Sequence, residues 1–186
     1  GRLSHIGYAR GAKQGEQGDP PPIGLPCENY RATDFQAIIL LEHLKYLRQE
    51  TKIREEGADF LRERLDKLPG LRVQAKGKKA TIQSYYIYAM ILDFEELKAG
   101  TTRQNIFEAL HAEGLTGIGP GWGAPMNKHR LWTVPEDKYR IESNEVAEDI
   151  VLNRLMQCSL SWLMADKNDL QKFSKAFEKV MNAFAL

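Results

Sequence analysis

The sequence is poor in the features that mark membranes, secretion and nucleic-acid binding. No run of 18 apolar residues occurs, and residues 1–18 are too polar for the apolar core of a secretory signal. The 26 basic and 25 acidic residues leave a formal net charge of +1, which argues against nucleic acid or an anionic membrane as the main partner. We therefore expect a soluble, cytoplasmic protein.

Motifs for metal binding, nucleotide binding and nucleophilic catalysis are also missing. The two cysteines, Cys27 and Cys158, lie far apart without metal-ligand spacing, so we expect reduced thiols and no metal site. The chain has no GxGxxG after a strand, no P-loop, no HExxH and no GxSxG. A chain of 186 residues that is 42% apolar and 27% charged can still bury a sizeable core.

The clearest local signal lies where a Gly- and Pro-rich opening, residues 1–26, gives way to a long helical pattern. Thr33 and Gln36 have the spacing of a capping box, which predicts a helix that begins near Asp34. Asn29, Tyr30 and Arg31 then lie just before a helix N-terminus, where amides and side chains can converge on an anion.

Further along, the hydrophobic periodicity predicts an α+β fold: a small, mostly antiparallel sheet with helices packed on one side. The first two helical patterns are divided by no breaker except Gly57, so one long bent helix up to Pro69-Gly70 is an alternative to two helices. The remaining expected elements are strands over 71–75, 83–93 (central in the sheet), 115–119 and 158–162, and helices over 102–113 (capped by Thr101 or Thr102), from Ser143 and from Asp166.

Residues 120–142 form a long segment without helical or strand period that carries Trp122, His129 and Trp132. Loops of this length inside compact domains tend to be functional, and the aromatic residues favour an ordered binding loop. For His129 a substrate contact and a structural or exposed role both remain open. The basic turn 76–79 reads most simply as a solvated loop tip, with phosphate binding as the lesser alternative.

The segment just before and at the start of the first predicted helix carries a family resemblance. The chain resembles the DegT/DnrJ/EryC1/StrS family of pyridoxal-phosphate (PLP) sugar aminotransferases, and the resemblance extends from about residue 24 to the closing helix. Its motifs are Glu28-Asn29-Tyr30-Arg31, Asp34-Phe35-Gln36-Ala37, Leu41-Glu42-His43-Leu44, Arg54, Pro69-Gly70, the Tyr-rich strand and the loop with Pro125. Glu28 and His43 depart from the usual family residues, which puts the sub-branch in doubt more than the family.

The resemblance implies a role for individual residues. Asn29 matches the amide that reaches the cofactor phosphate of the neighbouring subunit, so it implies a homodimer with an active site shared across the interface. Tyr30 and Arg31 would flank that site, and Arg31 offers a planar cationic fork to a phosphate or sugar-nucleotide group. Trp122 and His129 fall on the loop that lies near the sugar in the family, although local packing would explain Trp122 equally well.

The resemblance also implies that this chain is the C-terminal part of a fold-type-I PLP enzyme. Residues 1–26 would lead from a missing N-terminal cofactor-binding domain, and residues 27–186 would form the C-terminal aminotransferase domain. No lysine stands in the family's Schiff-base context, so we expect no catalytic residue here and little activity from this chain alone. The whole enzyme would move an amino group from glutamate or glutamine to a keto sugar, often nucleotide-linked, or to a keto cyclitol.

Two alternatives stay open at this stage. The protein could belong to a dehydratase branch of the same family, which uses PLP without the Schiff-base lysine. It could also be a non-catalytic dimerisation or binding module of the same architecture, with Asn29 as an ordinary turn residue. The sequence leaves the sugar or cyclitol, its nucleotide and the amino donor undetermined.

Overall fold

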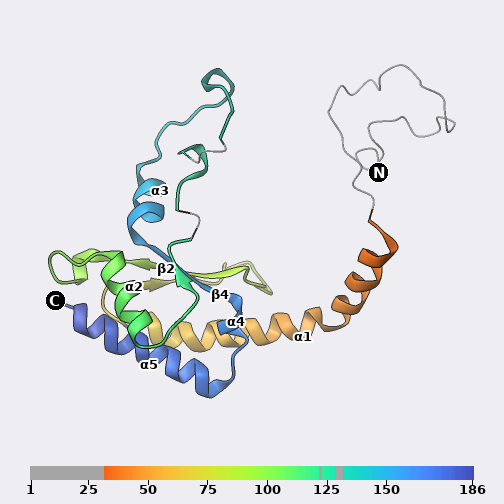
Figure 1. Cartoon of the computed structure of the whole chain (residues 1–186), viewed down its shortest axis with the longest axis horizontal. Helices are drawn as coiled ribbons and strands as arrows, with labels where there is room; N and C mark the ends of the chain where they lie inside the picture. Colours follow the sequence, from red (N-terminus) through yellow and green to blue (C-terminus); the bar gives the residue numbers. More distant parts are fainter. Residues whose placement is uncertain (1–31, 122, 129–131) are drawn as a thin grey trace. The chain divides into compact units, whose positions relative to one another are not determined.

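The computed structural model describes residues 32–121, 123–128 and 132–186 (Figure 1). The chain divides into two compact units, Gly1–Leu47 and Arg48–Leu186. None of the described helices combines the length and the apolar character needed to cross a membrane.

The first helix, α1, is a single helix from Asp34 to Leu65, which confirms both the predicted start and the alternative of one long helix. In the second unit it buries residues at helical spacing, because one side of it faces the core. These residues are Thr51, Arg54, Gly57, Ala58, Leu61 and Leu65. Gly57 permits a close approach: a Cβ there would lie 2.1 Å from the carbonyl oxygen of Leu163.

Four antiparallel strands form one sheet in the order β1-β2-β4-β3. They are β1 (Leu71–Val73), β2 (Ile87–Leu92), β3 (Ile118–Gly119) and β4 (Leu155–Ser159). The strand predicted over 83–93 is central, as expected, but it starts at Ile87. Tyr85 has a φ of +50°, which extended backbone cannot accommodate. A φ of +73° at Gly117 likewise delays β3 to Ile118.

The sheet buries one face against helices, which confirms the α+β prediction. Tyr88, Met90 and Met156 are fully buried on this face, and the Tyr88 hydroxyl donates to the Ala58 carbonyl at 3.3 Å. The second half of α1 lies beside α5 (Lys167–Phe184) along the sheet, and α2 (Arg103–Ala112) packs on α5 (Figure 1). Burial of Cys158 in this layer raises the pKa of its thiol to about 12, in keeping with a reduced thiol.

The predicted caps of α2 and α5 are largely confirmed. Thr102 rather than Thr101 is the N-cap of α2, in a capping box with Asn105. Gly114, with a φ of +87°, follows the end of that helix. Asp166 begins α5, because its carboxylate accepts a 2.9 Å hydrogen bond from the Asp169 amide.

The segment from 143 to 163 differs from the prediction. Ser143 is not a helix cap: Asn144 occupies the N-cap of α3 (Glu145–Asp149), which continues into a π-helical turn, η5 (Ile150–Arg154). The last strand is β4, three residues earlier than predicted, because alternation from Leu155 places Met156 and Cys158 in the core. The Ser159 hydroxyl then caps the short helix α4 (Leu160–Leu163), which takes the place of the end of the predicted strand.

The described residues between β3 and α3 are 120–121, 123–128 and 132–144 (Figure 1). They contain two short 3-10 turns, η3 (Met126–Lys128) and η4 (Glu136–Lys138), in otherwise irregular backbone. This agrees with the expectation of a long loop over 120–142.

Candidate functional site

The five residues predicted to contact cofactor or substrate lie outside the described residues. Asn29, Tyr30 and Arg31 precede the first of them, and Trp122 and His129 fall in the two internal gaps. Their roles therefore stay predictions, and the site has to be built from the described residues around them.

The start of α1, two residues after Arg31, has the predicted geometry. The Thr33 amide donates to Oε1 of Gln36 at 2.9 Å, and the Gln36 amide donates to Oγ1 of Thr33 at 3.3 Å. This reciprocal pair confirms the capping box. The end of α1 that follows the Asn-Tyr-Arg motif therefore presents the positive end of a helix dipole, a setting that favours an anion.

The first half of α1 is apolar on more than one side and exposed. With 3.6 residues per turn, Phe35, Ile39 and Tyr46 fall on one side of the helix and Leu40, Leu44 and Leu47 on another. Each of the six is at least 47% exposed, and Phe35 is 82% exposed. A helix that is apolar all round is normally buried, so this segment has the character of an interface.

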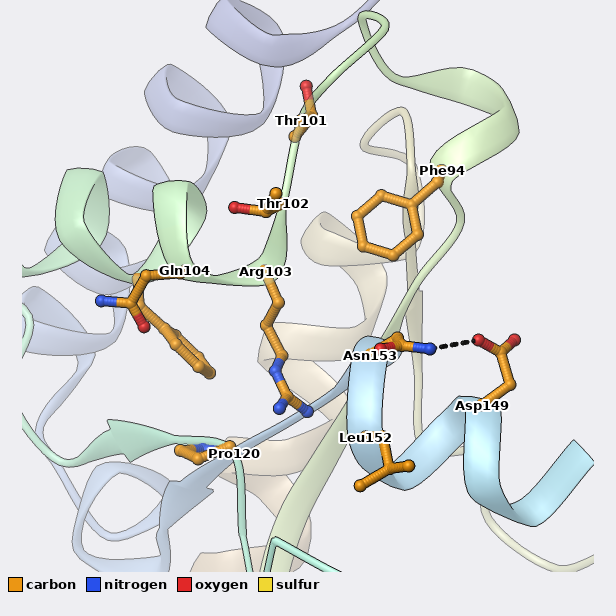
Figure 2. A pocket seen from close by; sticks show the side chains of 10 residues that line it. Phe94, Thr101, Thr102, Arg103, Gln104, Pro120, Asp149, Leu152 and Asn153 are labelled. Carbon is orange, nitrogen blue, oxygen red and sulfur yellow. Dashed lines mark hydrogen bonds between the residues drawn. The ribbon is translucent and has the colours of Figure 1, made fainter.

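A cavity of about 480 Å³ lies in the second unit between the start of α2, the turn after β2 and the π-helical turn (Figure 2). Its apolar wall comes from Phe94, Phe107, Pro120 and Leu152. Its polar wall comes from Thr101, Thr102, Arg103, Gln104, Asp149 and Asn153.

Arg103 is the cation of this cavity. Its Nη1 donates to the carbonyl oxygens of Val151 and Leu155, both at 2.9 Å. Desolvation by the surrounding protein lowers the pKa of the guanidinium. No carboxylate of the described residues lies within 4 Å of it. Its hydrogen bonds in this part of the chain go to the two backbone carbonyls, and its guanidinium carbon lies 5.9 Å from the centroid of the Phe107 ring.

Asp149 supplies the negative charge of this cavity. Its carboxylate accepts from Asn153 Nδ2 at 2.9 Å, drawn in Figure 2, and from Arg154 Nε at 2.5 Å. The hydrogen bond from Asn153, followed by the bond from Arg154, lowers the pKa of Asp149. The carboxylate is therefore neutralised within its own turn.

The pocket is open to solvent, and its described lining cannot hold PLP covalently. No lysine is among its described lining residues, and the described chain contains no cluster of three metal-ligating side chains. Sequence reasoning missed Arg103 as a site residue. A usable signal existed: a cation at the first position of a helix is unfavourable to the helix dipole, so it is expected to bond to another element.

Two weaker candidates have ordinary structural roles. Nζ of Lys76 pairs with Glu55 and donates to the Thr81 carbonyl at 3.1 Å, which favours the loop-tip interpretation of turn 76–79. His111 is exposed and its Nε2 lies 3.3 Å from the Ile118 carbonyl oxygen, as expected of a surface histidine.

Comparisons with known proteins agree on a family. The profile of the DegT/DnrJ/EryC1/StrS aminotransferase family matches residues 2–169. The L-glutamine:2-deoxy-scyllo-inosose aminotransferase of Streptoalloteichus tenebrarius is 28% identical over 170 residues, which is 84% of this chain and 39% of that protein. The enzyme of the same name from Streptomyces fradiae is 29% identical over 169 residues, with the same two coverages.

Solved structures show the same fold. 3-Amino-5-hydroxybenzoic acid synthase superposes with a TM-score of 0.74 at 16% identity, over 98% of this chain and 46% of that one. Helicobacter pylori PseC, an aminotransferase involved in the biosynthesis of pseudoaminic acid, superposes with a TM-score of 0.66 at 17% identity, over 98% and 45%. The chain thus spans about two fifths of the length of the curated relatives that it matches.

Proposed function

Because the chain belongs to the DegT/DnrJ/EryC1/StrS aminotransferase family, we propose that its protein transfers an amino group from glutamine or glutamate to a keto cyclitol or a keto sugar. The observation that carries the proposal is the family match over residues 2–169. Relatives named as L-glutamine:2-deoxy-scyllo-inosose aminotransferases favour glutamine as donor and a cyclitol as acceptor. The cytoplasm, where such small metabolites are found, is the proposed location.

The proposed cofactor is PLP, which supplies an electron sink for the carbon that loses a proton. Within this chain, Asn29 is proposed to donate to the cofactor phosphate, with Tyr30 and Arg31 beside it. The capping box at Thr33 supports this assignment, because it fixes a helix N-terminus close in sequence to Asn29. An amide donor next to a positive helix end suits a phosphate.

The loop over 120–142 is proposed to contact the acceptor, through Trp122 and His129. Support comes from contacts between η3, inside this loop, and the start of α3, which follows it. Asn127 accepts from Nδ2 of Asn144 at 2.8 Å, and Lys128 pairs with Glu148 at 2.5 Å. These contacts hold η3 against α3, and a binding loop requires such a fixed point on the scaffold.

The proposed assembly is a homodimer in which the site is shared between subunits. The first half of α1 supports it, because this segment exposes apolar side chains on several sides. Burial of those side chains against a second copy, against further parts of the same protein, or both would remove a large apolar area from water.

The direct test of this function is amino transfer, assayed with PLP, L-glutamine and a panel of keto cyclitols and keto sugars on the complete protein that contains this chain. An amine product supports the proposal. A deoxygenated keto sugar with no amine would indicate the dehydratase branch instead. Absence of both, with PLP bound or not, would favour a non-catalytic module.

A further inference from the structure

Arg103 occupies a position where its own helix does not favour it. It is the first residue of α2, directly after the N-cap Thr102. The N-terminus of a helix carries a partial positive charge, so a guanidinium there is tolerated best when it bonds elsewhere. Arg103 does so: it donates two hydrogen bonds of 2.9 Å to the segment 151–155, about 50 residues further along the chain.

One of those two acceptors, the Val151 carbonyl, is made available by the π-helical turn η5. The Leu155 amide donates to the carbonyl of Ile150, five residues back. In an α-helix the same amide would bond to Val151, so the wider turn leaves the Val151 carbonyl without that donor. Arg103 Nη1 donates to the Val151 carbonyl in place of that amide. The same nitrogen also donates to the Leu155 carbonyl at the start of β4.

Side-chain hydrogen bonds connect the π-helical turn to α3. Asp149, the last residue of α3, accepts from Asn153 and Arg154 of the turn at 2.9 and 2.5 Å. Arg154 also lies over the Phe94 ring, 5.8 Å from its centroid. In Figure 2, Arg103 and the Asp149–Asn153 pair face the same cavity from two different elements.

The N-cap and the helix of α3 also contact η3, the 3-10 turn inside the long loop. We call these four residues the clasp: Asn127, Lys128, Asn144 and Glu148. Asn144 Nδ2 donates to Asn127 at 2.8 Å and to Glu148 at 3.3 Å, and Lys128 donates to Glu148 at 2.5 Å. The position of η3 therefore depends on the position of α3.

We propose that Arg103 is a positioning residue for the loop between β3 and α3: it fixes the π-helical turn, which sets α3, which sets η3 through the clasp. The inference rests on the proposed function in one respect, namely that this loop contacts the acceptor. Its consequence is selective. Loss of Arg103 raises the KM for the keto acceptor and leaves the reaction with the amino donor nearly unchanged.

Hydrogen–deuterium exchange on the chain as printed tests the structural part. Arg103→Met removes both hydrogen bonds at similar side-chain length, and Arg103→Lys keeps a donor. Lys52→Met is the control, since it removes a cation from α1, outside both measured segments, and Lys52 is 76% exposed and pairs with the exposed Glu56. We expect Arg103→Met to speed exchange on the order of tenfold over 123–128 and 144–155 but not in α5, and Arg103→Lys to restore part of the protection.

A second variant keeps the proposal testable if Arg103→Met unfolds the domain. Glu148→Gln weakens the clasp without touching the cavity's cation, and it should speed exchange over 123–128 while the backbone of 150–155 stays protected. Unchanged exchange in both variants, or equal acceleration in α5, would overturn the proposal, since the latter is what a general loss of stability produces.

Steady-state kinetics on the complete protein test the functional part. For Arg103→Lys we expect a KM for the acceptor raised on the order of tenfold, with the KM for the amino donor within about twofold of the unsubstituted protein. If the unsubstituted protein transfers amino groups and both constants stay the same, the positioning role is wrong. If the unsubstituted protein transfers none, the proposed function fails, while the exchange result still decides whether Arg103 orders the loop.

Discussion

The backbones of α1 and α4 meet at Gly57 and Leu163, where a side-chain carbon added at Gly57 would lie 2.1 Å from the Leu163 carbonyl oxygen. Helix propensity alone predicts that Gly57→Ala stabilises α1 by roughly 1 kcal/mol. The contact predicts the opposite sign, because a backbone atom cannot move aside as the end of a side chain can. We expect Gly57→Ala to lower the free energy of unfolding by about 1–3 kcal/mol, measured by urea denaturation.

Gly119→Ala is the control for this substitution. An added Cβ at Gly119 meets nothing within 4 Å, and the residue is not among those with positive φ. Its unfolding free energy should stay within about 0.5 kcal/mol of the unsubstituted chain. Equal behaviour of the two variants would mean that α1 and α4 are not in this close contact.

Adjacent threonines at the start of α2 give a matched pair. Thr102 accepts from the Asn105 amide at 3.2 Å, and Asn105 accepts in return from the Thr102 amide at 3.0 Å. Thr101 has no part in this capping box. Thr102→Ala should therefore cost about 1 kcal/mol of unfolding free energy, and Thr101→Ala a few tenths at most. A larger loss from Thr101→Ala would place the cap one residue earlier.

Acid should weaken the fold partly through Glu96. The hydrogen bond from Arg72, followed by that from the Gly70 amide, lowers the pKa of Glu96. A carboxyl group with a lowered pKa in the folded state stabilises the fold above its unfolded pKa of about 4.3, and this contribution is lost as the pH falls through the folded value. Glu96→Gln should reduce the drop in urea midpoint between about pH 6 and pH 3.

Glu63→Gln serves as the comparison for Glu96. Glu63 is 76% exposed, and the Arg64 guanidinium with which it pairs is 3.9 Å away. Its removal should leave the acid dependence of the midpoint as it was. An unchanged dependence in Glu96→Gln as well would show that the Arg72–Glu96 pair contributes nothing measurable.

The apolar first half of α1 should make the isolated chain self-associate. Ile38 and Ile82 offer a matched test, since each is 65% exposed but they belong to different units. In sedimentation velocity, we expect concentration-dependent association that Ile38→Glu weakens on the order of tenfold or more, because a charge at an apolar interface is costly. Ile82→Glu should leave it unchanged. A chain that stays monomeric at all concentrations would remove this support for the dimer.

Much of the fold could be predicted from the sequence where the signal is local. The capping box of Thr33 and Gln36, the central strand and the start of α5 after Asp166 follow from spacing and side-chain type alone. The segment 143–163 could not be predicted in the same way. The π-helical turn accepts a hydrogen bond from another element, here from Arg103. Residues close to the turn in the sequence do not indicate that donor, because it lies 48 residues away.

The candidate site divides along a similar line. The motif of Asn29 to Arg31 and the loop residues Trp122 and His129 could be proposed only through the family resemblance, and they lie outside the described residues. The cavity beside Arg103 arises from four stretches separated in the chain, around residues 94, 101–107, 120 and 149–153, so no motif marks it. What the sequence offered there was an anomaly, a cation at a helix start.

The central claim, amino transfer by the complete protein, is tested most directly by following the nitrogen atom. The complete protein is incubated with PLP, a keto cyclitol and L-glutamine labelled with ¹⁵N at its α-amino group, and the cyclitol product is analysed by mass spectrometry. We expect an aminocyclitol that carries the ¹⁵N. We also expect a reduced rate when Asn29 is replaced by Ala, and an unchanged rate when the exposed Asn182 is replaced by Ala. A cyclitol or sugar product without the label, from a protein that demonstrably binds both PLP and glutamine, would contradict the central claim.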